Sequence, residues 1–342
     1  MQAFDDKEFL PTSALAKITQ LRMEDPGYPA RIAKSRKRRE TLSSDGRLNI
    51  LAADHPARRV TKVGDDPLMM ADRHGYLARI VRVLQCDTVD GVMASMDILE
   101  ELLVLHALFA EAGGPALLDN RLLIASLNRG GLAGASWEMD DPITGPSANA
   151  CASMNLDGVK LLLRICDEDG DSLRTLMYCA KAITEMNALR LPTFLEPLPV
   201  AKSDGGYRVI KTSEALAKIV GVASALGDSS SFLWLKLPYC DNYEVVARAT
   251  TLPILLLGGE SVGDATPLLR QIEAGLNSGS NVRGALVGRN VLYPGPEDPF
   301  VVAQATGSII HQRWTVEGTV AAQESWRGCD LGVIAECCRR MK

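Results

Sequence analysis

The sequence of 342 residues has no apolar run of the ~18 residues that a membrane-spanning helix needs, so we expect no membrane association. Its formal net charge of -5 disfavours a nucleic-acid-binding surface. The opening stretch MQAFDDKEFL lacks the apolar segment of a secretory signal, so we expect a cytoplasmic protein. The four histidines form no HxxxH or HxH pair and the eight cysteines no CxxC pair, so we expect reduced thiols and no metal site.

Hydrophobic residues nevertheless make up 46% of the chain, and many gather in short continuous runs, as in strands buried on both faces. Most of these runs are separated by longer stretches of helical periodicity, such as 171–190. This repetition predicts the α/β class. We expect a single (β/α)8 TIM barrel with a C-terminal helical tail over 48–342, preceded by an N-terminal helical lead-in over 1–47. The predicted strands are 48–54, 90–95, 121–126, 157–163, 192–197, 232–237, 253–259 and 283–288.

In such a barrel the chemistry lies at the carboxyl ends of the strands. Two lysines interrupt apolar strands there, Lys236 in FLWLKLP and Lys160 in DGVKLLL. Loss of hydration lowers the pKa of a lysine, and a neutral amine can attack a carbonyl to form a Schiff base. Glu196 and Asp54 end strands of their own. Glu196 could offset part of the lysine charge and shuttle a proton, and Asp54 could orient a substrate hydroxyl or hold a lysine. The alternative for these four residues is a set of buried ion pairs without a catalytic role.

Glycines that end the last two predicted strands indicate a phosphate site. Gly258 and Gly259 end the seventh strand, and Gly288 with Arg289 ends the eighth, where barrels commonly bind phosphate. Arg129 follows the third strand, and its forked guanidinium suits a carboxylate or phosphate. A loop salt bridge is an equal alternative for Arg129.

Two further features receive other interpretations. His55 follows Asp54 directly, and strand alternation predicts that its side chain points away from the barrel interior. The basic segment 31–40 (RIAKSRKRRE) is predicted to be a solvated helix face, with a phosphate-facing or subunit-contact role as the alternative.

In this order, the motifs resemble the class I, Schiff-base aldolases of the DeoC/LacD superfamily over residues 48–295. That superfamily includes deoxyribose-phosphate aldolase, tagatose-bisphosphate aldolase and the archaeal-type fructose-bisphosphate aldolases. The segment LKLPY is similar to the strand that carries the Schiff-base lysine, which implies that role for Lys236. DGVK and FLE are similar to the tagatose-bisphosphate branch and imply that Lys160 and Glu196 assist catalysis.

Other segments of the resemblance agree in part. The glycines at 258–259 and the segment 287–291 are similar to the family's phosphate-binding loops. The first-strand segment ILAADH is similar to the fructose-bisphosphate branch, but Pro56 stands where that branch has glycine. The tyrosine that the archaeal-type branch uses on strand five is absent.

The overall pattern is most similar to an actinobacterial branch found with inositol catabolism genes. That resemblance implies cleavage of 5-dehydro-2-deoxy-6-phosphogluconate to dihydroxyacetone phosphate and malonate semialdehyde, without a cofactor or metal, by a homo-oligomer. Three alternatives stay open: a Schiff-base acyltransferase, a sugar-phosphate isomerase or epimerase, and a catalytically silent sugar-phosphate-binding barrel. An essential lysine separates the Schiff-base enzymes from the others.

Overall fold

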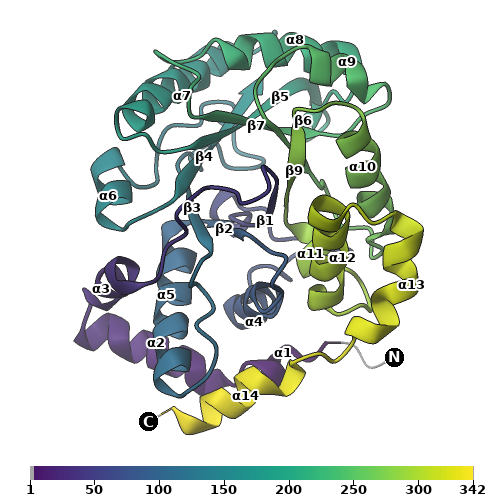
Figure 1. Ribbon diagram of the computed structural model, residues 1–342. Coiled ribbons are helices and arrows are strands. Elements are labelled where there is room, and N and C mark those ends of the chain that lie inside the picture. Colours follow the sequence, from purple (N-terminus) through teal and green to yellow (C-terminus); the bar gives the residue numbers. More distant parts are fainter. Residues whose placement is uncertain (1–3, 342) are drawn as a thin grey trace.

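The predicted (β/α)8 barrel is confirmed by a computed structural model, which describes residues 4–341 (Figure 1). Eight parallel strands follow one another in the order β1-β2-β3-β4-β5-β7-β8-β9, and pairing of β9 with β1 closes the ring. The strands are β1 (Leu48–Ala53), β2 (Gly91–Ala94), β3 (Leu122–Ser126), β4 (Gly158–Ile165), β5 (Thr193–Ser203), β7 (Leu233–Pro238), β8 (Ile254–Leu257) and β9 (Val282–Val287).

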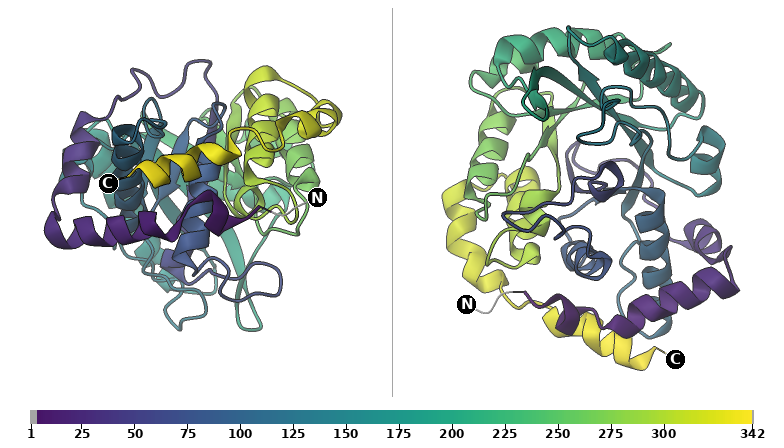
Figure 2. Two further views of the ribbon diagram at one scale, coloured as in Figure 1. Left: turned by 90° about the horizontal axis from the view of Figure 1, so that it is seen from below. Right: turned by 180° about the vertical axis from the view of Figure 1, so that it is seen from behind.

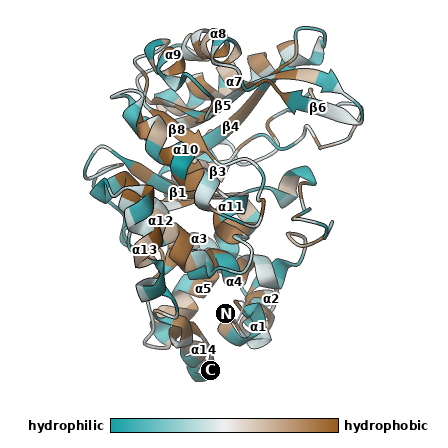
Figure 3. Ribbon diagram, turned by 90° about the vertical axis from the view of Figure 1, so that its right-hand side faces the viewer, coloured by the Kyte–Doolittle hydropathy of each residue, from teal (hydrophilic) through white to brown (hydrophobic). Residues whose placement is uncertain are grey.

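Helices surround the strands and bury the outer face of the barrel. Figure 3 shows hydrophobic residues gathered on the strands and on the helix faces turned toward them. Inside the barrel a separate apolar layer, which includes Ile50, Phe194 and Leu255, fills the space below the carboxyl ends. The helices are α4 (Arg73–Leu84), α5 (Met96–Glu111), α6 (Ala148–Ser153), α7 (Asp171–Ala188), α8 (Ser213–Ser224), α9 (Tyr243–Arg248), α10 (Thr266–Asn277), α11 (Arg289–Leu292) and α12 (Pro299–Gln312).

The two ends of the chain add a further layer on one side of the barrel. The N-terminal helices α1 (Asp6–Phe9), α2 (Thr12–Glu24) and α3 (Tyr28–Ser35) pack on α4 and α5. The C-terminal helices are α13 (Val316–Trp326) and α14 (Leu331–Arg340), and α14 lies beside α1 (Figures 1 and 2). Within residues 4–341, no helix combines the length and apolar composition needed to cross a membrane.

One hairpin extends beyond the predicted strands. The fifth strand was predicted to end at residue 197, but β5 continues to Ser203 and pairs antiparallel with β6 (Gly206–Val209). The signal was present in the sequence, because a turn of the type Asp-Gly stands at 204–205 between apolar and polar residues that alternate. The hairpin carries Tyr207 and Val209 over the mouth of the barrel.

The basic segment 31–40 is only in part a solvated helix face, because most of its residues are exposed but two of its arginines are not. Helix α3 ends within it, and after the helix Arg36 and Arg39 turn inward while Arg38 stays exposed. Arg36 has a fully buried side chain that pairs with Asp157 just before β4, and Arg39 pairs with Asp90 just before β2. Sequence alone could not show this, because the acidic partners lie about 50 and 120 residues away.

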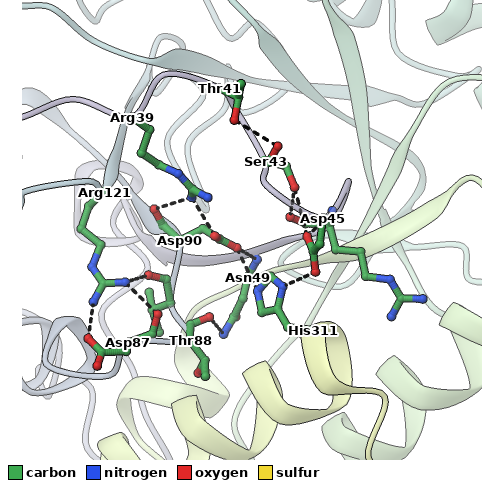
Figure 4. A network of polar contacts seen from close by, with 12 residues as sticks. Arg39, Thr41, Ser43, Asp45, Asn49, Asp87, Thr88, Asp90, Arg121 and His311 are labelled. Atoms are coloured by element: carbon green, nitrogen blue, oxygen red, sulfur yellow. Dashed lines mark hydrogen bonds and ion pairs between the residues drawn. The ribbon is translucent and has the colours of Figure 1, made fainter.

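Asp90 directly precedes β2, at the amino ends of the strands and therefore opposite the carboxyl ends. It belongs to a polar network there (Figure 4). His311 of α12 contacts the carboxylate of Asp45 through Nδ1 (2.8 Å) and that of Asp90 through Nε2 (3.1 Å). The backbone N–H of Asn49 donates to Asp90 as well. These contacts fasten the lead-in, β1 and α12 together, which indicates a role in stability.

Candidate active site

A cavity of about 660 Å³ opens at the carboxyl ends of the strands. Its size is that of a pocket for a small molecule. All nine residues selected from the sequence line it, although they come from seven strand ends or loops. They are Asp54, Arg129, Lys160, Glu196, Lys236, Gly258, Gly259, Gly288 and Arg289.

Glu196 joins the two lysines at the centre of the cavity. Lys236 Nζ donates to Glu196 Oε2 at 3.0 Å, and Lys160 Nζ lies 2.6 Å from the same oxygen. Lys160 is 1% exposed and Lys236 6%. Glu196 and Lys236 each stand two residues beyond an inward-facing residue, Phe194 and Trp234. Lys160 pairs with Phe194 between β4 and β5, so its side chain also points into the barrel interior.

Burial sets the protonation of this cluster. It lowers the pKa of Lys236, and it lowers the pKa of Lys160 well below the usual value, with the charge of Arg129 adding to the effect. Burial alone would raise the pKa of Glu196, but the two neighbouring lysines outweigh it and hold that pKa below its usual range. The arrangement therefore favours an ionised carboxylate beside amines that give up protons readily.

Asp54 is held in a fixed position on the adjoining wall. Its carboxylate pairs with Arg129, accepts a hydrogen bond from Ser126 Oγ at 2.8 Å, and lies 3.8 Å from Lys160 Nζ. The ion pair matches the salt-bridge alternative for Arg129, whereas the alternative for Asp54 is an ion pair with one of the lysines. Asp54 already accepts from these donors, so its geometry suits orientation of a group more than exchange of a proton.

The glycines of the loops after β8 and β9 line the cavity beside Arg289. Gly259 has φ +71°, a backbone conformation that favours glycine. A Cβ at Gly288 would lie 2.4 Å from the carbonyl oxygen of Ala52, so only glycine fits beside β1. Arg289 begins α11, whose first N–H groups have no acceptor within the helix, and its Nε has no hydrogen-bond partner within residues 4–341.

His55 lines the cavity, contrary to the prediction from strand alternation. Strand β1 ends at Ala53, and the backbone at His55 is already helical because a short 3₁₀ turn begins at Pro56. The alternation rule therefore does not reach this residue. Burial, followed by the nearby charges of Arg289 and Lys236, lowers the pKa of His55 to about 3, so the imidazole is neutral.

Several other polar residues of the cavity were not selected from the sequence. They are Glu138 in the long loop after the third strand, Arg58 in the turn after the first strand and Arg164 on the fourth strand. Glu138 Oε1 accepts from Arg58 Nη2 at 2.6 Å and from Arg164 Nη1 at 2.5 Å. The available signal was Arg164 itself, a charge that follows the buried apolar run of β4 by one position.

The fold places the chain among (β/α)8 barrels, and solved Schiff-base aldolases share this architecture. A solved Schiff-base-forming fructose-1,6-bisphosphate aldolase has a TM-score of 0.56 and 23% identity over 78% of this chain and 95% of that chain. The fructose-bisphosphate aldolase from Slackia heliotrinireducens has a TM-score of 0.62 and 15% identity over 93% of this chain and 94% of that chain. At these identities the likeness concerns the fold.

The chain belongs to the Cgl0159-like family, whose model matches residues 46–307. The crystal structure of Cgl0159 from Corynebacterium glutamicum is 35% identical, with a TM-score of 0.83 over 89% of this chain and 99% of that chain. A search of curated proteins found no match.

Proposed function

We propose that the chain is a class I aldolase that cleaves a phosphorylated keto-sugar or keto-sugar acid through a Schiff base on Lys236. The observation that carries this proposal is a buried lysine of lowered pKa that contacts a carboxylate in a small-molecule cavity. The shared fold of a Schiff-base-forming aldolase supports it.

The position of the phosphate loops favours Lys236 over Lys160 as the nucleophile. Lys236 stands on β7, next to β8, whose following loop carries Gly258 and Gly259. Lys160 stands on β4, which is four strands away from β9 in either direction around the ring. A phosphate held by the loops after β8 and β9 therefore brings a nearby ketone to Lys236.

In the proposed mechanism, the neutral amine of Lys236 attacks the ketone carbon, and loss of water from the carbinolamine gives an iminium. A base then removes the proton of the hydroxyl beta to the iminium carbon. The C–C bond breaks, the aldehyde leaves, and the electron pair of the broken bond moves toward the iminium to form an enamine. Protonation of the enamine carbon and addition of water release the ketone product and the free amine.

The acid–base roles follow from the contacts. Glu196 is ionised and contacts both amines, so it is suited to take the hydroxyl proton and return it. Lys160, which contacts the same oxygen, donates a proton to the departing carbinolamine hydroxyl. Asp54, paired with Arg129, orients substrate hydroxyls.

The finer proposal concerns the substrate. We propose 5-dehydro-2-deoxy-6-phosphogluconate, whose cleavage gives dihydroxyacetone phosphate and malonate semialdehyde. The phosphate loops suit the phosphate of that substrate, and its carboxylate requires cationic groups elsewhere in the cavity.

The test is borohydride trapping of the protein with dihydroxyacetone phosphate, followed by peptide mapping. The expected result is a reduced adduct on Lys236 that is abolished in Lys236→Met. Lys218→Met removes an exposed lysine of α8 and serves as the matched control, which should trap the adduct normally. An adduct on Lys160 would reverse the two lysine roles, and no adduct with a folded protein would refute the aldolase proposal.

A further inference from the structure

The cavity wall that faces the phosphate loops carries two arginines bound to a single carboxylate. Arg164 belongs to β4, and Glu138 to the loop between β3 and β4. In the closed ring, β3 is four strands from β8 and β4 is four strands from β9, so this wall lies across the barrel from the phosphate loops. Arg58 comes from the loop after β1, but its Nε donates to the carbonyl oxygen of Gly131 (2.8 Å), so its head lies on the same wall.

We infer that Arg58 and Arg164, arranged around Glu138, form a second anion subsite that binds a carboxylate or phosphate at the aldehyde-derived end of the substrate. This inference rests on the proposed function, because the aldehyde-derived end is defined by a ketone held at Lys236. It deepens that proposal by requiring an acidic group at each end of the substrate.

The charge of the cluster supports an anionic ligand. Burial and the neighbouring Arg58 lower the pKa of Arg164 only to about 10, so the Arg164 guanidinium is charged at neutral pH. Glu138 contacts both guanidinium groups and its Oε2 already accepts from the N–H of Gly134 at 2.8 Å, while the carboxylate of Asp141 lies close enough to act on Arg164. Both arginine side chains are largely removed from water, with exposures of 16% and 5%, so an anion from the cavity would replace hydration that they lack.

The remaining hydrogen-bond donors support the same ligand. Within residues 4–341, Arg58 uses Nε and Nη2, and Arg164 uses Nη1 and Nη2. Arg58 Nη1 and Arg164 Nε therefore have no acceptor in the part of the chain that the structure describes. Both residues line the cavity, and guanidinium donors are well matched to carboxylate and phosphate oxygens.

The experiment compares aldol condensations with aldehydes that do or do not carry a distal anionic group. Dihydroxyacetone phosphate is the donor, and kcat/KM is measured for glyceraldehyde 3-phosphate against glyceraldehyde and for malonate semialdehyde against propanal. The first pair tests a distal phosphate and the second a distal carboxylate. In the natural protein at least one charged aldehyde should be preferred over its neutral partner.

The test variant is Arg58→Gln, which should reduce that preference on the order of 10–100-fold, the range for a lost hydrogen bond to a charged group. Arg208→Gln is the matched control, because Arg208 is exposed on β6 between the cavity-lining Tyr207 and Val209 and does not itself line the cavity. It should leave the preference unchanged. Borohydride trapping of dihydroxyacetone phosphate reports whether each variant keeps a folded site. If Arg58→Gln fails to trap, Arg58→Lys supplies the same comparison, with a smaller loss of preference.

The outcomes separate the two proposals. No trapped adduct in the natural protein means that the proposed function fails. An adduct without a preference for either charged aldehyde overturns the second subsite but leaves the aldolase proposal standing. The second subsite is also overturned if the preference survives in Arg58→Gln. The same holds if all four aldehydes react equally slowly with this variant, and in both cases Arg58, Arg164 and Glu138 serve only the structure of the loop.

Discussion

Replacement of Glu196 by Gln tests the centre of the site, because one carboxylate oxygen contacts both lysines. Two unit charges 3.0 Å apart interact by about 5 kcal/mol at an effective dielectric constant of about 20. Loss of even a quarter of that interaction would lower the pKa of Lys236 by about one unit. The amine would then be neutral, and able to attack a ketone, at lower pH.

Cleavage of the C–C bond should become slower in this variant, although the amine attacks the ketone more readily. The amide of the Glu196→Gln variant offers no basic oxygen for the hydroxyl proton, so we expect turnover to fall by about 10²–10⁴-fold, the usual contribution of a general base. Destabilisation should stay below the ~3–5 kcal/mol of a broken buried ion pair, since either lysine can lose its proton. The variant is therefore expected to form the adduct but to release the aldehyde slowly.

The assay measures adduct trapping and turnover separately between pH 5 and 9. In Glu196→Gln the midpoint of trapping should move down by about one pH unit or more. Glu244→Gln, at an exposed position of α9, is the control and should reproduce the profile of the natural protein. A midpoint that stays in place or moves up, or a turnover loss below about tenfold, would refute the roles given to this carboxylate.

Two other predictions concern the phosphate loop and the opposite end of the barrel. Gly288→Ala places a Cβ 2.4 Å from the carbonyl oxygen of Ala52, so it should cost about 1–3 kcal/mol in denaturant unfolding and weaken inhibition by inorganic phosphate. Normal phosphate inhibition in this variant would contradict the site. Burial opposes the charge of His311, but hydrogen bonds to Asp90 and Asp45 raise its pKa above the usual value. The stabilisation is therefore present below the unfolded pKa of about 6.5 and is lost as pH rises through the folded pKa. The stability difference between the natural protein and His311→Gln should be larger at pH 5.5 than at pH 9, and the reverse order would refute the assignment.

The sequence carried the architecture and the chemical candidates. Continuous apolar runs predicted all eight barrel strands, because strands covered on both faces leave no room for polar alternation. Lys236 and Lys160 could be selected for a related reason. A charge inside an apolar strand is costly unless it has a partner or a function, so its mere presence in the sequence is informative.

Tertiary structure alone decided which groups meet. Glu196 bridges both lysines, and Arg58 reaches Glu138 across some 80 residues of sequence, because the ring brings the ends of distant strands to one rim. The turn that begins after Asp54 redirects His55 into the cavity. No periodicity encodes such contacts, since partner choice among charges depends on distances of a few ångströms that only the closed barrel defines.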